Sequence, residues 1–277
     1  MRTSYAWRWA GVLGLAFIMG VQARAQARLP TVEEAQRLEE GTALTLGGET
    51  LKLGILAFEY GITDAINVGT DPPMWLIRTA EPVLIPNLHI KVIAYRWNQL
   101  WLAGQLAVYY ANIDRGDASG ILWTIPLTAY ASYEIDPRWW VHGELTYDII
   151  WGSGTGDLTQ TEIGGAAATR SLQIAATGEY RVRPDIAITL RGRIQLYTGR
   201  LALSGSTNPD AFTAIDADAR VTARNSHPWQ IVPAVAFLWQ RIRLTAGVGY
   251  GNYFVPGMQI PLTKQSFVPE GSFSVVF

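Results

Sequence analysis

The chain has 277 residues, of which 49% are hydrophobic and only 16% charged, and its formal net charge is −1. This near-neutral balance argues against a nucleic-acid partner, and the lack of cysteine excludes a disulfide scaffold. Charged residues are scarcer than the ~25% of a typical soluble domain. After residue 25 no stretch reaches the ~18 apolar residues of a membrane-spanning helix. The composition therefore indicates either an unusual soluble β protein or a protein that crosses a membrane without helices.

Residues 1–25 have the features of a secretory signal peptide. Arg2 and Arg8 provide the positive region, the apolar run WAGVLGLAFIMGV follows, and ARA at 23–25 matches an A-x-A cleavage site. The apolar run is too short for the alternative, a membrane anchor. Residues 26–40, which include TVEEAQRLEE, are predicted to form a periplasmic N-terminal segment: a short helix, a partial plug or a disordered leader.

An alternation of apolar and polar residues with a period of two dominates the rest of the chain. In WWVHGELTYDIIW, residues 139–151, the odd positions form an apolar face with tryptophan at each end, whereas the even positions include His142, Glu144 and Asp148. A β-strand places these two sets on opposite sides of a sheet. The same pattern predicts strands at 50–60, 64–71, 87–97, 99–111, 121–133, 171–183, 186–197, 229–239 and 242–253, and a last strand at 271–277.

Three features favour a transmembrane barrel over a soluble sandwich. The predicted strands have ~10–13 residues, close to the ~9–11 of tilted membrane strands and longer than the ~5–6 usual in globular sheets. Trp and Tyr lie at the ends of the apolar faces, as in an interfacial aromatic belt. The opposite faces carry Arg, Glu and His, which a sandwich core could not bury unpaired. We therefore predict an all-β fold, a transmembrane antiparallel up-and-down β-barrel over residues 41–277.

The alternation gives eleven strands after residue 50, whereas bacterial barrels have an even number. GTALTL at 41–46 is predicted to supply one more, which gives about twelve strands, with ten as the alternative.

Pro126 and Pro233 lie inside predicted strands, where proline removes a ladder donor, so bulges or local strand ends are expected there. Short connections, which are periplasmic in outer-membrane barrels, alternate with long ones at 72–86, 112–120, 152–169, 198–228 and 255–269.

The chain ends on GSFSVVF, in which Phe273, Val275 and Phe277 share one face of a predicted closing strand. With this ending, and with FEYGITDAINVGT at 58–70, the chain resembles a broad group of poorly characterised bacterial outer-membrane β-barrel proteins with repeated Tyr-Gly-x-Thr-Asp periplasmic turns. The resemblance implies that Phe273, Val275 and Phe277 form the C-terminal signal read by the barrel-assembly machinery, although Ser272 stands where that signal usually has glycine. It also implies a location in the outer membrane of a Gram-negative cell, with outer-membrane lipid and the assembly machinery as partners.

Charged residues on the predicted inner face are the candidates for a functional site. In the register set by the turns, Glu144, Glu179 and Arg191 lie at similar depth, with His142 and Arg193 nearby. Opposite charges there can frame a constriction, as charged rings do in pores, or only neutralise one another in an interior filled by side chains. The sequence thus predicts a narrow passive, porin-like pore or a structural membrane component, with solute and oligomeric state left open. Further candidates for the lining are His89, Lys91 and Arg243.

An outer-membrane enzyme acting on lipid or peptide is the alternative function. A hydrolase needs a nucleophile, a base and an orienting group within reach. His142 has Glu144 two residues along on the same face, but no serine with a nucleophile signature is placed near it. His89 and His142 also lack metal-ligand spacing. No catalytic residue, metal ligand or cofactor is therefore predicted.

Deletion of Phe277 is expected to impair membrane insertion more than any activity, because the barrel-assembly machinery is predicted to recognise the terminal aromatic residue. The measurement is the amount of folded protein in outer-membrane fractions, compared with that of the unaltered chain. Normal outer-membrane levels of the deletion variant contradict the prediction.

Overall fold

The computed structural model describes residues 41–72, 86–115, 118–158, 161–198, 201–208, 215–221, 227–254, 257 and 261–277. The predicted signal peptide (1–25) and N-terminal segment (26–40) lie outside the described residues and stay predictions. Within the described ranges, no helix is long and apolar enough to cross a membrane.

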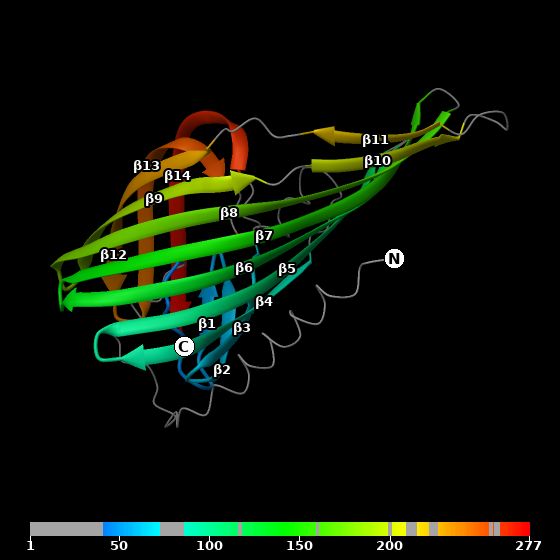
Figure 1. Cartoon of the computed structure of the whole chain (residues 1–277). Helices are drawn as coiled ribbons and strands as arrows, with labels where there is room; N and C mark the ends of the chain where they lie inside the picture. The colour runs from blue at the N-terminus through cyan, green and yellow to red at the C-terminus, as the bar shows by residue number, and fades with distance from the viewer. Residues whose placement is uncertain are drawn as a thin grey trace.

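The described chain consists almost entirely of antiparallel strands, which are β1 (Leu51–Gly54), β2 (Phe58–Thr63), β3 (Ile66–Thr70), β4 (Asn87–Trp97), β5 (Leu100–Arg115), β6 (Ala118–Asp136), β7 (Trp139–Leu158), β8 (Thr161–Arg183), β9 (Ile186–Thr198), β10 (Leu201–Asn208), β11 (Ile215–Val221), β12 (Trp229–Trp239), β13 (Ile242–Phe254) and β14 (Pro261–Val276). Twelve of them form a closed barrel in which β1 to β9 pair in order, β9 pairs with β12, and β14 pairs back onto β1. β10 and β11 form an extra hairpin against β8, at the far end of the longest strands (Figure 1). The predicted barrel of about twelve strands is confirmed.

The twelfth barrel strand does not come from residues 41–46, so this part of the prediction is wrong. Residues 50–60, predicted as one strand, contain two, because the chain reverses between Gly54 and Phe58 to pair β1 with β2. Apolar residues continue at alternate positions through the reversal, and therefore the pattern alone does not reveal it.

The two ends of the barrel differ in their connections. Short turns join β2 to β3, β4 to β5, β6 to β7, β8 to β9 and β12 to β13, as predicted, and the C-terminus lies beside β1 and β13 at the same end, which we call the short-turn end. At the opposite, long-strand end, much of the predicted loops at 112–120 and 152–169 is instead strand, because β5 to β8 continue there. These segments are rich in Gly, Ser and Thr and lack the apolar face from which strands were predicted.

Apolar side chains point outward along the strands and polar ones point inward, as predicted. On β7, Leu145 is 45% exposed, whereas its neighbours Glu144 and Thr146 are buried. A bilayer accommodates such an apolar exterior, and a closed barrel leaves no unpaired strand edge within it. Exposed aromatic residues gather toward both ends of the barrel. Those beside the short turns are Trp97, Tyr133, Trp139 and Trp239, and those toward the long-strand end are Trp151, Tyr197 and Tyr250.

Residues 41–48, which we call the lumen segment, have no strand partner and lie inside the barrel. The Ala43 N–H donates to Ser132 Oγ (2.7 Å) and the Leu46 N–H to Asn67 Oδ1 (3.1 Å). Ala43 and Leu46 are fully buried, so these side-chain acceptors replace the water that their backbone has lost. The side chains of Ala43, Leu44 and Leu46 pack against inward-facing residues near the short-turn end. These residues are Trp101, Ala103, Trp140 and Val276.

Both prolines interrupt the strand ladder on one side only. Between β5 and β6 the pairing skips the two positions around Pro126, and between β12 and β13 it skips Pro233 and its neighbour. The register is unchanged across each gap, and the other side of each proline stays paired. The expected local interruption is present, whereas a bulge at these positions is not.

Gly61 on β2 allows the lumen segment to lie directly on the barrel wall, because a Cβ there would overlap the carbonyl oxygen of Gly47. Gly61→Ala is expected to lower the free energy of unfolding by about 1–3 kcal/mol, as overpacking does, measured by denaturant unfolding in detergent. Gly143→Ala is the matched control, since nothing lies within 4 Å of a Cβ at that outward position. Equal stabilities of the two variants would contradict the proposed close packing.

Candidate functional site

Ion pairs join strands that are not adjacent inside the barrel. Arg193 on β9 and Glu144 on β7 reach each other across β8, whereas each of the other two pairs joins strands that are three apart around the ring. Because both partners are largely withdrawn from water, each charge depends on the other for compensation. The pairs are Arg193 with Glu144 (3.2 Å), Arg243 with Glu179 (2.9 Å) and Arg191 with Glu270 (3.3 Å).

Three of the five predicted lumen residues, Glu144, Arg191 and Arg193, line one chamber. Glu179 does not join them, because it lies four residues beyond Ala175, the residue of β8 opposite Glu144, and pairs with Arg243 instead. Glu179 and His142 are thus not among the residues that line this chamber, and a constriction formed by the five residues stays a prediction.

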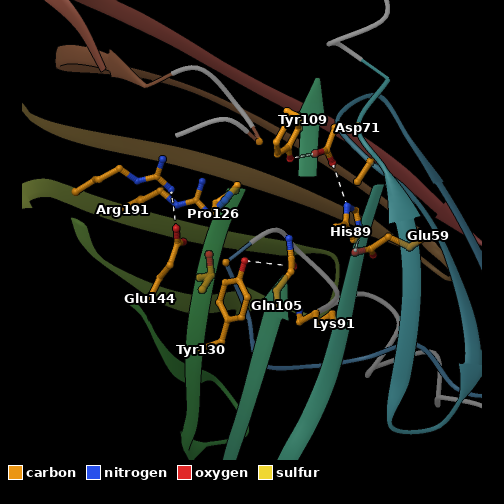
Figure 2. Close-up of a pocket in the computed structure, with 15 residues that line it drawn as sticks. Glu59, Asp71, His89, Lys91, Gln105, Tyr109, Pro126, Tyr130, Glu144 and Arg191 are labelled. Carbon is orange, nitrogen blue, oxygen red and sulfur yellow. Dashed lines mark hydrogen bonds and ion pairs between the residues drawn. The ribbon is translucent and has the colours of Figure 1, made fainter. Parts of the chain in front are cut away.

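The chamber is small, with a volume of about 60 Å³. It lies on the long-strand side of the lumen segment, whose residue Gly41 forms part of its lining. Figure 2 shows Glu144 and Arg191 on one side and Asp71 and His89 on the other. Its ionisable walls comprise three carboxylates, three cations and one imidazole, which are Glu59, Asp71, Glu144, Lys91, Arg191, Arg193 and His89.

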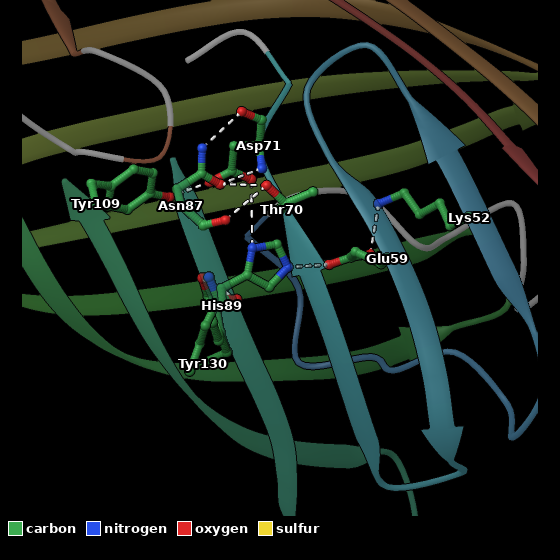
Figure 3. Close-up of polar contacts among 9 residues, drawn as sticks. Lys52, Glu59, Thr70, Asp71, Asn87, His89, Tyr109 and Tyr130 are labelled. Carbon is green, nitrogen blue, oxygen red and sulfur yellow. Dashed lines mark hydrogen bonds and ion pairs between the residues drawn. The ribbon is translucent and has the colours of Figure 1, made fainter. Parts of the chain in front are cut away.

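A line of polar contacts forms one wall of this chamber (Figure 3). Lys52 Nζ lies 3.2 Å from Glu59 Oε2, and His89 Nε2 lies 3.4 Å from Glu59 Oε1. The other ring nitrogen of His89 lies 3.6 Å from Asp71 Oδ1, and the Tyr109 hydroxyl donates a hydrogen bond to Asp71 Oδ2. Lysine thus compensates the Glu59 carboxylate, and the His89 imidazole lies between the carboxylates of Glu59 and Asp71.

Gly69 makes the contact between Glu59 and His89 possible. In the register, Glu59 on β2 lies opposite Gly69 on β3, which in turn lies opposite His89 on β4. A Cβ at Gly69 would overlap His89 Nε2, so only glycine leaves room for the imidazole to reach across the intervening strand.

Asp71 is fixed by its backbone as well as by its side chain. Its N–H donates to Asn87 Oδ1 (2.6 Å), and Asn87 Nδ2 donates back to the Asp71 carbonyl (3.1 Å). Gly257, which precedes β14, has a left-handed φ of 76°, and a Cβ there would overlap the Tyr109 hydroxyl. The long-strand side of the chamber is therefore held by side-chain bonds to backbone rather than by regular sheet pairing.

Neither histidine in the lumen has the surroundings of a catalytic base. Both ring nitrogens of His89 face carboxylates, which leaves no nitrogen directed at a hydroxyl. His142 Nδ1 lies 2.8 Å from Ser132 Oγ, a serine without a nucleophile signature that the sequence analysis did not place there. Ser132 is fully buried and already accepts the Ala43 N–H, which leaves no room for a substrate. Among the described residues, no group of His, Asp and Glu is arranged to hold a metal ion.

Sequence reasoning found part of this lining and missed the rest. It named His89 and Lys91 as possible lining residues, and both line the chamber. It missed Glu59 and Asp71, which lie beside a reversal and at a strand end, where the alternation gives little information. Ser132 could have been found, because the β6–β7 turn fixes the register that places it opposite His142.

The closed antiparallel ring, its apolar exterior and its polar interior together define a transmembrane β-barrel of the outer-membrane type. The terminal strand closes this ring, since the Phe277 N–H donates to the Leu51 carbonyl (2.8 Å). The role of its aromatic ending as an assembly signal stays a prediction.

Comparison with known proteins gives distant likenesses. No protein-family model matches the chain, and no curated protein matches it. The translocator domain of the autotransporter NalP from Neisseria meningitidis is 11% identical, with 96% of this chain and 95% of that chain covered and a TM-score of 0.48. OmpT of Vibrio cholerae is 11% identical over 82% and 94% of the two chains (TM-score 0.24), and CdiB from Acinetobacter baumannii is 10% identical over 82% and 59% (TM-score 0.29). These values carry no information on substrate or partner.

Removing one member of the buried Arg243–Glu179 pair is expected to destabilise the barrel. Arg243→Met leaves the Glu179 carboxylate without this partner and should lower the free energy of unfolding by about 3–5 kcal/mol, measured in detergent. The double variant Arg243→Met, Glu179→Gln removes both charges and should recover much of that loss. If the double variant is less stable than Arg243→Met, the pair does not act as described.

Proposed function

We propose that the protein is a narrow passive pore of the bacterial outer membrane, exported by the signal peptide at residues 1–25. The observation that carries this proposal is the lumen segment, which lies inside the barrel at the short-turn end. On this proposal, small solutes reach the chamber from the long-strand end, and the lumen segment limits their passage.

The contacts of the lumen segment support a restricted pore. Its apolar side chains pack against Trp101 and Trp140, which lie 4.9 Å apart between ring centroids. Beyond this packing, it is held by individual hydrogen bonds, including that of the Thr45 hydroxyl to the Asp64 carbonyl (2.7 Å), rather than by a strand ladder. Such a segment can shift without breaking the ring of strands, because no barrel strand pairs with it.

The outer-membrane location and the partners follow from the same reasoning. The apolar exterior would contact outer-membrane lipid, and the C-terminal strand would be recognised by the barrel-assembly machinery. The enzyme alternative has no supporting observation in the described lumen, because the only serine hydroxyl beside His142 is covered by the lumen segment.

A cross-link between the lumen segment and the wall tests this proposal. The chain has no cysteine, so Ala43→Cys with Ser132→Cys introduces a single possible disulfide where the Ala43 nitrogen lies 2.7 Å from Ser132 Oγ. In planar bilayers the oxidised variant should conduct little, and reduction should raise its conductance several-fold, because the segment is then able to move.

The matched control is Ala131→Cys with Gly143→Cys, a pair of directly opposite residues on the outer face. Its oxidation should leave conductance unchanged, since it does not touch the lumen. Equal conductance of the lumen pair when oxidised and reduced would reject the lumen segment as the obstacle. A complete lack of channels in every form would support a structural membrane component instead.

A further inference from the structure

We propose that residues 32–40 form a helix inside the barrel, on the long-strand side of the lumen segment, where it covers the chamber. These residues lie outside the described part of the chain, and the position and conformation of the first described residue, Gly41, carry the proposal. It goes beyond the pore proposed above, because the place of the helix can be measured whether or not the barrel conducts. In a conducting barrel, solutes would have to pass beside this helix.

The lumen segment runs from the middle of the barrel to the short-turn end. Gly41 lines the chamber, where a Cβ would come within 3.2 Å of Glu144 Oε2. Gly48 reaches the β2–β3 turn, where its N–H donates to Asp64 Oδ1 (2.9 Å). Glu144 is the sixth residue of β7, about 17 Å along the strand from the turn at that end. The chain that precedes Gly41 therefore starts deep inside the ring of strands.

The sequence before Gly41 has the signals of a helix that ends there. Thr31 and Glu34 have the T-x-x-E spacing of a capping box, in which the threonine oxygen accepts an N–H of the first turn and the glutamate bonds back to the threonine N–H. Gly41 has a φ of +84°, and glycine in this left-handed conformation is common just after the end of a helix. Residues 32–40 contain neither proline nor glycine. These signals together bound a helix about 14 Å long.

Arg191 lies where the end of such a helix needs a cation. A Cβ at Gly41 would come within 2.7 Å of Arg191 Nη2, so the guanidinium group is directly beside the residue that would follow the helix. The last carbonyl groups of a helix have no partner within it and carry a partial negative charge. A guanidinium group has several N–H donors, so Arg191 can serve these carbonyl groups while it stays paired with Glu270 through Nη1.

The short-turn side of Gly41 is already filled. The lumen there holds the apolar side chains of the lumen segment, packed against Trp101 and Trp140. Residues 32–40 carry four glutamates and one arginine, and these charges would lose their water beside the apolar packing, which is unfavourable. On the long-strand side, by contrast, Gly41 faces the ionisable walls of the chamber. The helix is therefore placed on the long-strand side, between the chamber and that end of the barrel.

Distances between spin labels, measured by electron paramagnetic resonance, test the place of the helix. The protein is purified from outer membranes into detergent, and because the chain has no cysteine, each pair of labels needs only two substitutions. Ala35→Cys is combined with either Ile149→Cys or Val141→Cys, two positions on the outer face of β7 that lie about 26 Å apart along the strand. The label at 35 should lie roughly 10 Å closer to the label at 149 than to that at 141. An equal or shorter distance to the label at 141 overturns the proposal.

Arg241→Cys is the matched control for these distances. It lies in the β12–β13 turn at the short-turn end, so its label should lie closer to the label at 141 than to that at 149. The label at 35 should give the opposite order. Broad distances from residue 35 that overlap for the two reference positions mean that this residue has no fixed place, and that outcome also overturns the proposal.

The reaction rate of a cysteine in the chamber tests whether the helix covers it. Gln105 lines the chamber, so the thiol of Gln105→Cys should react slowly with a charged methanethiosulfonate reagent. Deletion of residues 31–38 should raise this rate roughly tenfold, because exposure controls thiol reactivity, and should leave the rate of the exposed Arg241→Cys unchanged. An unchanged rate at position 105 in the folded deletion variant overturns the covering role. Should the deletion variant fail to fold, Ala35→Pro, which interrupts a helix, serves the same comparison.

Discussion

The pairing of the last strand with the first is the constraint on which the other features depend. Leu51 and Phe277 exchange two backbone hydrogen bonds, of 3.2 and 2.8 Å, and this contact turns an open sheet into a ring. A bilayer offers no water to an unpaired strand edge, so an open form of the same sheet would be costly there. Closure also separates an interior from the lipid, and the inward side chains must then satisfy one another.

The interior shows how that requirement is met. Its charged groups are distributed among many strands, and two of its ion pairs join strands that are three apart around the ring. Arg191 and Glu270 are 79 positions apart, and Arg243 and Glu179 are 64 apart. Such pairs favour the curved wall of the ring, because strands three apart in a flat sheet would hold the same residues farther from each other. The lumen segment adds an apolar contribution at the short-turn end, where Trp101 and Trp140 would otherwise face an empty interior.

The period-two pattern was sufficient to predict the barrel, the orientation of each strand's faces and the inward position of Glu144 and Arg193. It could not predict what lies inside, because neither the partners across the lumen nor the path of residues 41–48 follows from local alternation. GTALTL has the composition of a strand, yet it lies where side chains rather than strands accept its N–H groups. Asp71, just after β3, and Tyr109 on β5 meet across β4, and a contact between strands that are not adjacent does not follow from local alternation.

The lumen segment has a consequence for the order of folding, because it is joined directly to β1, the strand that closes the ring. A segment enclosed by the finished barrel must either enter through an open end or be surrounded while the sheet curls. Its continuity with β1 favours the second route, in which β14 reaches β1 with the segment already lying on the inner face. Filling the interior and closing the ring would then form one cooperative step, governed by contacts of residues 41–54 with the C-terminal strand.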